Sequence, residues 1–475
     1  MTRARSLAAI AFAITSLLAC QRADGAGKTP PAPTPTPTPA PGAALHKATP
    51  PPPIAKGSVS VEVIPQYEQV HTDTRELALL VRLTGTGEAP SARPPLDLSV
   101  VIDRSGSMNG DKLRDVKTAA LELLDTLRPV DTVTLISYSD QVERLSTRQA
   151  VDAAGRQRLR RALLRMDADG MTALGPALVT GLEMSEAGKR DDLRLAHVLL
   201  FSDGMANVGE QRPEVLGARA ALAATREVSV STLGVGVDYN EDPMTKLADQ
   251  GGGRYHFIKD SQAIAGILSD EMNGLVATVA RGVNMSLSAA PGVEVTQVHG
   301  YATTRDGATT QARIGSLGAG QRREIIVRVR LPRTAPPRVA LGTLAVQFSD
   351  LGADGAERRI DVPVAIGVTA DVAVAQASEH KDVTVRVAEV DSAETLELAA
   401  RAADRGDYAA ASASLDQALT DLASQAVLTP SKDLDERIVE LEEAKQELGT
   451  ARESSQSRKG YSKKLKARAY RNRKK

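Results

Sequence analysis

Serine, threonine and aspartate residues lie together in three loops of this 475-residue chain. The loops read Asp103-Arg104-Ser105-Gly106-Ser107-Met108, Asp169-Gly170-Met171-Thr172-Ala173-Leu174 and Ser202-Asp203-Gly204. Their hydroxyl and carboxyl groups can form a ligand site, and a serine hydroxyl can act as a nucleophile when a base lies beside it. An Asp-x-Ser-x-Ser string arises by chance in many proteins, so its meaning depends on the elements around it.

The first and third loops each follow an apolar run that predicts a buried strand, over 96–102 and 196–201. Further strands are predicted over 133–137, 228–235 and 254–258, and helices over 112–127, 157–164, 174–184, 214–225, 243–248 and 263–275. This alternation over 96–276 predicts an α/β domain with a doubly wound, mostly parallel sheet. Ligands bind such sheets beyond the carboxyl ends of the strands, where the loops are expected to meet.

Composition excludes several classes of site. Lys plus Arg is 59 and Asp plus Glu is 59, so no overall basic field favours nucleic acid. A single cysteine excludes an intramolecular disulfide and cysteine-based zinc or iron–sulfur sites. Aromatic residues make up 3% of the chain, too few for platforms that stack single-stranded bases.

The three loops, in this order, resemble those of the von Willebrand factor A (VWA) domain, whose members hold a divalent cation in a metal-ion-dependent adhesion site. Gly234-Val235-Gly236, Tyr239-Asn240-Glu241-Asp242 and 247–253 also look like segments of bacterial extracytoplasmic members. The resemblance covers residues 96–276 and implies a Rossmann-like VWA fold. Met171 departs from the family pattern, in which a smaller residue usually precedes the threonine.

The resemblance implies one ion, Mg²⁺ or else Mn²⁺ or Ca²⁺, and a role for each loop residue. Ser105 and Ser107 would bind the ion through their hydroxyls, and Thr172 directly or through water. Asp103 and Asp203 would supply charge through ordered water. Mg²⁺ takes six oxygen ligands, so an open position would accept an Asp or Glu of a partner protein. The implied role is capture of a carboxylate, without a reaction.

Two other functions compete with this interpretation. A hydrolase using Ser105 or Ser107 needs a nearby base, but the six histidines (46, 71, 197, 256, 299 and 380) form no motif and no Gly-x-Ser-x-Gly elbow is present. We therefore predict that the protein is not an enzyme. The second alternative is an envelope scaffold with a VWA fold in which Ser105 and Asp203 merely cap helices.

The amino terminus predicts export and lipidation. Residues 1–19 have Arg3 and Arg5 before an apolar run too short to span a bilayer, which is typical of a signal peptide. Leu17-Leu18-Ala19-Cys20 resembles a lipoprotein cleavage site, which implies acyl chains on Cys20 and attachment to a bacterial membrane. Residues 20–56 then form a Pro-rich spacer. The expected location is the cell envelope, on the outer-membrane or periplasmic face or at the cell surface.

The remaining segments are predicted by their periodicity. Residues 57–95 and 277–375 alternate as strands do. They form either two separate small β units that flank the VWA domain or, as bacterial proteins of this type suggest, one β-sandwich in which the VWA domain is inserted. Residues 390–450 predict a helical hairpin or a coiled coil. The basic tail, 451–475, predicts a disordered end, which either is simply solvated or binds a polyanion such as lipid head groups or an envelope polymer.

Overall fold

The computed structural model describes residues 48–88, 94–188, 194–203, 206–236, 241–258, 262–332 and 337–474. The predicted signal peptide, Cys20 and the spacer up to residue 47 lie outside these residues. Within the described part, no helix is both long and apolar enough to cross a membrane.

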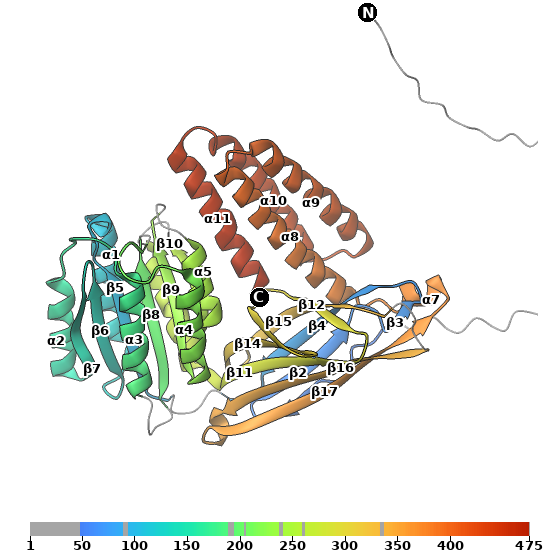
Figure 1. Cartoon of the computed structure of the whole chain (residues 1–475), viewed down its shortest axis with the longest axis horizontal. Helices are drawn as coiled ribbons and strands as arrows, with labels where there is room; N and C mark the ends of the chain where they lie inside the picture. Colours follow the sequence, from blue (N-terminus) through green and yellow to red (C-terminus); the bar gives the residue numbers. More distant parts are fainter. Residues whose placement is uncertain are drawn as a thin grey trace, which may run out of the picture. The chain divides into compact units, whose positions relative to one another are not determined.

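The VWA-like region is built on one six-stranded sheet in the order β10-β9-β8-β5-β6-β7. Its strands are β5 (Leu96–Asp103), β6 (Thr132–Tyr138), β7 (Val142–Ala150), β8 (Leu195–Ser202), β9 (Val228–Val235) and β10 (Gly252–Ile258). All neighbours pair in parallel except β7, which runs antiparallel to β6. The predicted parallel sheet is therefore present, with an added antiparallel edge strand (Figure 1).

Helices cover both faces of this sheet. They are α1 (Asp111–Thr126), α2 (Ala153–Leu164), α3 (Leu174–Gly188), α4 (Pro213–Thr225), α5 (Glu241–Gln250) and α6 (Gln262–Val276). Side chains of β5 alternate between two cores: Val100 and Ile102 pack with α1, α2 and α6, whereas Val101 packs with α3, α4 and α5. This alternation confirms the doubly wound fold.

A β-sandwich adjoins this region, and its strands come from both sides of it in sequence. One sheet has the order β1-β2-β4-β15-β12, and the other β13-β14-β11-β16-β17-β3. The bounds are β1 (Ile54–Lys56), β2 (Val59–Pro65), β3 (Gln69–His71), β4 (Glu76–Gly85), β11 (Thr278–Ala289), β12 (Glu294–Val298), β13 (Thr303–Asp306), β14 (Thr309–Gly318), β15 (Arg322–Arg330), β16 (Arg338–Asp350) and β17 (Ala356–Thr369).

The pairing of β4 with β15 joins the part of the sandwich that precedes the VWA-like region in sequence to the part that follows it. Leu79 of β4 lies opposite Val327 of β15, more than two hundred positions later. Both sheets contribute to one apolar core. The fold class predicted from the sequence, a VWA-like domain inserted in a β-sandwich, is confirmed. Strand β1 begins at Ile54, within the segment assigned to the spacer.

The carboxyl-terminal region is more extensive than the predicted hairpin. It contains α7 (Val372–Ala377), α8 (Lys381–Asp404), α9 (Tyr408–Leu428), α10 (Lys432–Thr450) and α11 (Ser455–Arg473). Leu434, Leu441 and Leu448 of α10 share one core with α8 and α9, so α10 packs on the preceding pair.

The prediction of a disordered basic tail was wrong, because residues 455–473 form helix α11. Acidic residues from separate elements neutralise its charge. Lys463 Nζ lies 2.5 Å from Glu241 Oε2 of α5, and Arg468 Nη2 lies 2.8 Å from Glu443 Oε2 of α10. The helix also has two apolar faces: Tyr470 belongs to the VWA core, and Leu465 belongs to the helical core.

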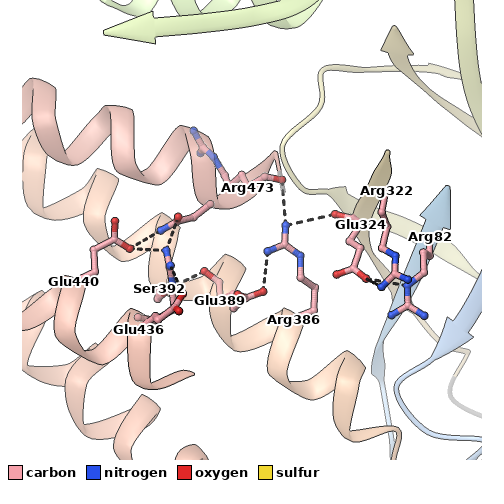
Figure 2. Close-up of polar contacts among 11 residues, drawn as sticks. Arg82, Arg322, Glu324, Arg386, Glu389, Ser392, Glu436, Glu440 and Arg473 are labelled. Carbon is pink, nitrogen blue, oxygen red and sulfur yellow. Dashed lines mark hydrogen bonds and ion pairs between the residues drawn. The ribbon is translucent and has the colours of Figure 1, made fainter. Parts of the chain in front are cut away.

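A buried arginine of α8 joins the helical region to the sandwich. The Arg386 side chain is 2% exposed and donates to Glu389 Oε2 at 2.9 Å. Its Nη2 also lies 3.5 Å from the carbonyl oxygens of Glu324 in β15 and Arg473 in α11 (Figure 2). One guanidinium thus holds a sheet strand and the carboxyl end of α11 against α8.

Candidate functional site

The first loop begins where β5 ends, at the fully buried Asp103. The Ser105 backbone N–H donates to Asp103 Oδ1 at 2.8 Å, and the Ser202 hydroxyl donates to Asp103 Oδ2 at 2.8 Å. A short 3-10 turn, Gly106–Met108, follows, and the buried Met108 anchors it in the core. These bonds fix the turn that presents Ser105 and Ser107.

The third loop brings Asp203 to the same place, because β5 and β8 are adjacent parallel strands. The Ser107 hydroxyl donates to Asp203 Oδ1 at 2.7 Å, and the hydroxyl oxygens of Ser105 and Ser107 are 3.2 Å apart. Asp203 is buried. Four of the five predicted residues therefore form one continuous polar cluster at the carboxyl edge of the sheet.

The Thr172 loop is attached to this cluster through its backbone. Gly106 N–H donates to the Gly170 carbonyl at 3.0 Å, and Thr172 N–H donates to Asn207 Oδ1 at 2.7 Å. Thr172 is buried, yet among the described residues no hydrogen bond joins its hydroxyl to the other four side chains. The second loop is thus adjacent to the cluster, whereas Met171 is 53% exposed.

A lysine that the sequence analysis did not single out contacts the cluster. Lys112 Nζ lies 2.5 Å from Asp203 Oδ2 and 3.2 Å from the Ser107 carbonyl oxygen. A cation therefore already neutralises the carboxylate oxygen that Ser107 does not contact. Lys112 follows Ser107 by five positions in the first turn of α1, so its proximity could have been predicted from the helix start.

Burial controls the electrostatics of the cluster. Burial raises the pKa of Asp103, and the hydrogen bonds from Ser105 and Ser202 oppose this effect. Burial, followed by the charge of Asp103, also holds the pKa of Tyr138 well above its ordinary value. The cluster thus carries negative charge in a poorly solvated place, which a cation would stabilise.

The donor set fits a hard divalent cation. The four joined side chains offer only hydroxyl and carboxylate oxygens, as Mg²⁺, Mn²⁺ and Ca²⁺ prefer. Among the residues that the structure describes, no group of three or more His, Cys, Asp or Glu residues could hold a metal. An ion at this edge would therefore have to use serine or threonine hydroxyls, which are the groups present.

The histidines that the structure describes do not contact this cluster. In the described part of the chain, the Ser105 and Ser107 hydroxyls contact each other and Asp203, and no histidine contacts them. At the opposite edge of the sheet, however, His197 and His256 both meet the buried Glu271 of α6. The sequence analysis missed this cluster, because its members are distant in sequence and follow no motif.

Comparison with known proteins agrees with this geometry. Residues 97–270 match the family model of the von Willebrand factor type A domain. An uncharacterised protein of Synechocystis is 27% identical over 291 residues, which cover 58% of this chain and 67% of that protein. The uncharacterised protein YfbK of Escherichia coli is 28% identical over 200 residues, covering 42% of this chain and 34% of YfbK.

Solved structures share the fold beyond that domain. A von Willebrand factor type A protein from Catenulispora acidiphila has a TM-score of 0.69 at 19% identity, covering 87% of this chain and 96% of its own. The ArnB paralog VWA2 from Sulfolobus acidocaldarius has a TM-score of 0.56 at 17% identity, covering 87% and 99%. The sheet, its three loops and the family match together show that residues 97–270 of this chain form a von Willebrand factor type A domain.

Proposed function

We propose that the protein binds a protein partner through a divalent ion that bridges the VWA domain to a carboxylate of the partner. The observation that supports this most strongly is the joined set of Asp103, Ser105, Ser107 and Asp203 oxygens at the carboxyl edge of the sheet. Lys112 forms an ion pair with Asp203, so a positive charge of the chain already lies against one carboxylate of this cluster.

Each loop has a distinct part in this proposal. Ser105 and Ser107 bind the ion through their hydroxyls, and Thr172 binds directly or through water. Asp103 and Asp203 supply charge through ordered water. The ion, Mg²⁺ or else Mn²⁺ or Ca²⁺, supplies Lewis acidity toward an Asp or Glu of the partner. The chain's own residues hold and orient, and no step of bond breaking is required of them.

We further propose that the protein acts in a bacterial envelope, attached by lipid on Cys20. The apolar run ending in Leu17-Leu18-Ala19-Cys20 and the Pro-rich spacer after it support this location. Matches to uncharacterised proteins of Synechocystis and Escherichia coli agree with a bacterial setting. The anchor and spacer would hold the VWA domain away from the membrane surface.

Capture from solubilised native envelopes tests this function. We expect the tagged wild-type protein to retain a partner in Mg²⁺ or Mn²⁺ and to lose it in chelator. Asp103→Ala should abolish this retention with the fold intact by circular dichroism. Asp111→Ala is the matched control, because Asp111 lies in the same region with its side chain 81% exposed. Retention that survives chelation contradicts the proposal.

Two other functions predict different results. A scaffold with no metal role shows no heat on titration with Mg²⁺ or Mn²⁺. A hydrolase turns over ester or peptide libraries and loses that activity in Ser105→Ala or Ser107→Ala. The absence of a histidine from the described surroundings of both serines favours carboxylate capture over hydrolysis.

A further inference from the structure

A small cavity lies at the amino edge of the VWA sheet, opposite the proposed metal site. It has a volume of about 60 Å³ and is closed by three parts of the fold. The VWA domain contributes Ser229, Arg254 and Glu271, the sandwich contributes Arg323 of β15, and Lys474 follows α11. These segments are far apart in sequence and meet only in the folded chain.

Two guanidinium groups, those of Arg254 and Arg323, line this cavity, and neither forms an ion pair with a residue that the structure describes. Arg254 is partly buried, and within the described residues its guanidinium forms no hydrogen bond or ion pair. Arg323 Nε is shielded from solvent and has no hydrogen-bond partner in the same residues, and Nη1 donates to the Lys474 carbonyl at 3.2 Å. Burial, with the charge of Arg254 among the further causes, lowers the pKa of Arg323.

The one carboxylate of the cavity is already engaged. Glu271 accepts a hydrogen bond from the Ser231 hydroxyl on Oε1, and its Oε2 lies 3.2 Å from His256 Nε2. His197 Nε2 lies 3.5 Å from Oε1. Burial raises the pKa of Glu271, but these neighbours outweigh it and bring the pKa to about 2. Glu271 is therefore ionised and directed toward the histidines.

Lys474, a further cation at this cavity, forms its ion pair with Asp249 and not with Glu271. Its Nζ lies 3.0 Å from Asp249 Oδ1 and 3.8 Å from the centroid of the Tyr301 ring. Among the described residues, Arg323 thus remains largely removed from water and Arg254 partly so, and neither guanidinium forms an ion pair. Leaving such charges unpaired in a protein interior is costly, so the arrangement favours a ligand of opposite sign.

We propose that this cavity binds a small oxyanion of phosphate size, held between Arg254 and Arg323. Planar guanidinium groups donate paired hydrogen bonds to phosphate and carboxylate oxygens. Ser316 lines the same cavity and its hydroxyl can supply a further donor, whereas the Ser229 hydroxyl already lies 2.6 Å from His197 Nδ1. Because the two arginines belong to the VWA domain and the sandwich, the anion would also join these parts.

Inorganic phosphate is the probe for this site, titrated into the full chain by calorimetry with chelator present and ionic strength held constant. We expect saturable binding of one phosphate and a rise in the unfolding temperature. Arg323→Gln and Arg254→Gln should each weaken binding at least tenfold. Glycerol phosphate in parallel separates a free anion from the phosphate group of a larger molecule, and the small cavity predicts tighter binding of the free anion.

Arg322→Gln is the matched control, because it lies beside Arg323 on β15 with its side chain 60% exposed. It should bind phosphate as the wild type does. Without phosphate, Arg323→Gln should unfold at the same or a higher temperature than the wild type, since it removes an uncompensated charge. The proposal is overturned if the wild type shows no saturable binding, or if Arg323→Gln and Arg254→Gln bind phosphate as tightly as the wild type does.

Discussion

The two edges of the VWA sheet differ in charge and in how they are assembled. The carboxyl edge gathers Asp103 and Asp203 among serine hydroxyls, and its groups come from loops of one domain. The amino edge gathers Arg254 and Arg323 around a small cavity, and the second of these comes from the sandwich. One mostly parallel sheet therefore carries the proposed cation site at one end and the proposed anion site at the other.

The two ends of the sheet depend on different parts of the chain. The carboxyl edge is held by hydrogen bonds among neighbouring loops, such as Gly106 N–H to the Gly170 carbonyl. The cavity at the amino edge is also lined by Arg323 of the sandwich and by Lys474, which follows α11. Substitutions in α11 should therefore alter the amino edge more than the carboxyl edge. Substitutions in the loops of the carboxyl edge should leave the amino edge unchanged.

Tyr470→Ala in α11 should have the largest effect on stability. Tyr470 is buried in the VWA core, meets Tyr255 edge to face, and accepts the Tyr255 N–H at 3.2 Å through its hydroxyl. Removing a buried aromatic ring of this kind costs about 4 kcal/mol of unfolding free energy. Denaturant unfolding measures it, with Tyr470→Phe as the control that keeps the ring.

Tyr470→Phe should lower the free energy of unfolding by about 1 kcal/mol, which is typical for the loss of one hydrogen bond. Because Tyr470 lies far from Asp103 in the fold, affinity for Mg²⁺ in Tyr470→Ala should stay at the wild-type value wherever the protein is folded. A loss of metal affinity in Tyr470→Ala would show that the two edges are coupled, against the comparison drawn here.

Glu271→Gln should destabilise the protein at neutral pH, and this effect should disappear as the pH is lowered. The pKa of Glu271 falls from 4.5 to about 2 on folding, so its ionised form stabilises the protein above pH 4.5 and this stabilisation is lost as pH falls toward 2. At pH 7 the variant should be less stable by about 3 kcal/mol, and near pH 2 the difference should vanish. Urea unfolding from pH 7 to 2 measures this, with the exposed Glu357→Gln as control.

In metal-free protein, Asp103→Asn at the carboxyl edge should change the stability at neutral pH in the opposite direction to Glu271→Gln. Burial raises the pKa of Asp103, so its charged form costs stability at neutral pH and the cost falls as the pH is lowered. The variant should therefore be at least as stable as the wild type at pH 7 in chelator. Equal responses of both edges to acid would contradict the contrast between them.

Lys112→Ala should change the affinity for metal modestly, and the change should be a gain. The Lys112 ammonium occupies Asp203 Oδ2 at 2.5 Å and so competes with a divalent ion for that carboxylate. Its removal should tighten Mg²⁺ binding about tenfold, which corresponds to about 1.4 kcal/mol. Calorimetry measures the change, and Lys117→Ala on the same helix is the control. Weaker binding in Lys112→Ala would mean that the lysine helps to build the site.

The sequence predicted the carboxyl edge well because its determinants are local. Asp103, Ser105 and Ser107 lie close together in sequence, and Asp203 directly follows the neighbouring strand β8, so the parallel pairing of β5 and β8 brings them together. Strand β7 was missed, because most of its residues are polar and it does not show the alternation of apolar and polar residues that a half-buried strand shows.

The amino edge and α11 could not be predicted in this way. Ten basic residues without an acid between 457 and 475 predict repulsion, and only the fold places Glu241 and Glu443 against them. Arg323 approaches Arg254 only after the sandwich has closed beside the VWA domain. A run of like charges in the sequence predicts repulsion within that run, whereas the acidic residues that neutralise it here lie far away in sequence.

Titration of the purified chain with Mn²⁺ tests the central claim most directly. We predict one bound ion per chain for the wild type, unchanged binding in Arg323→Gln, and no measurable binding in Asp103→Ala that retains the wild-type circular dichroism spectrum. If the wild type binds no ion, or if Asp103→Ala binds it equally well, the carboxyl edge is not a metal centre and the proposed capture of a carboxylate is wrong.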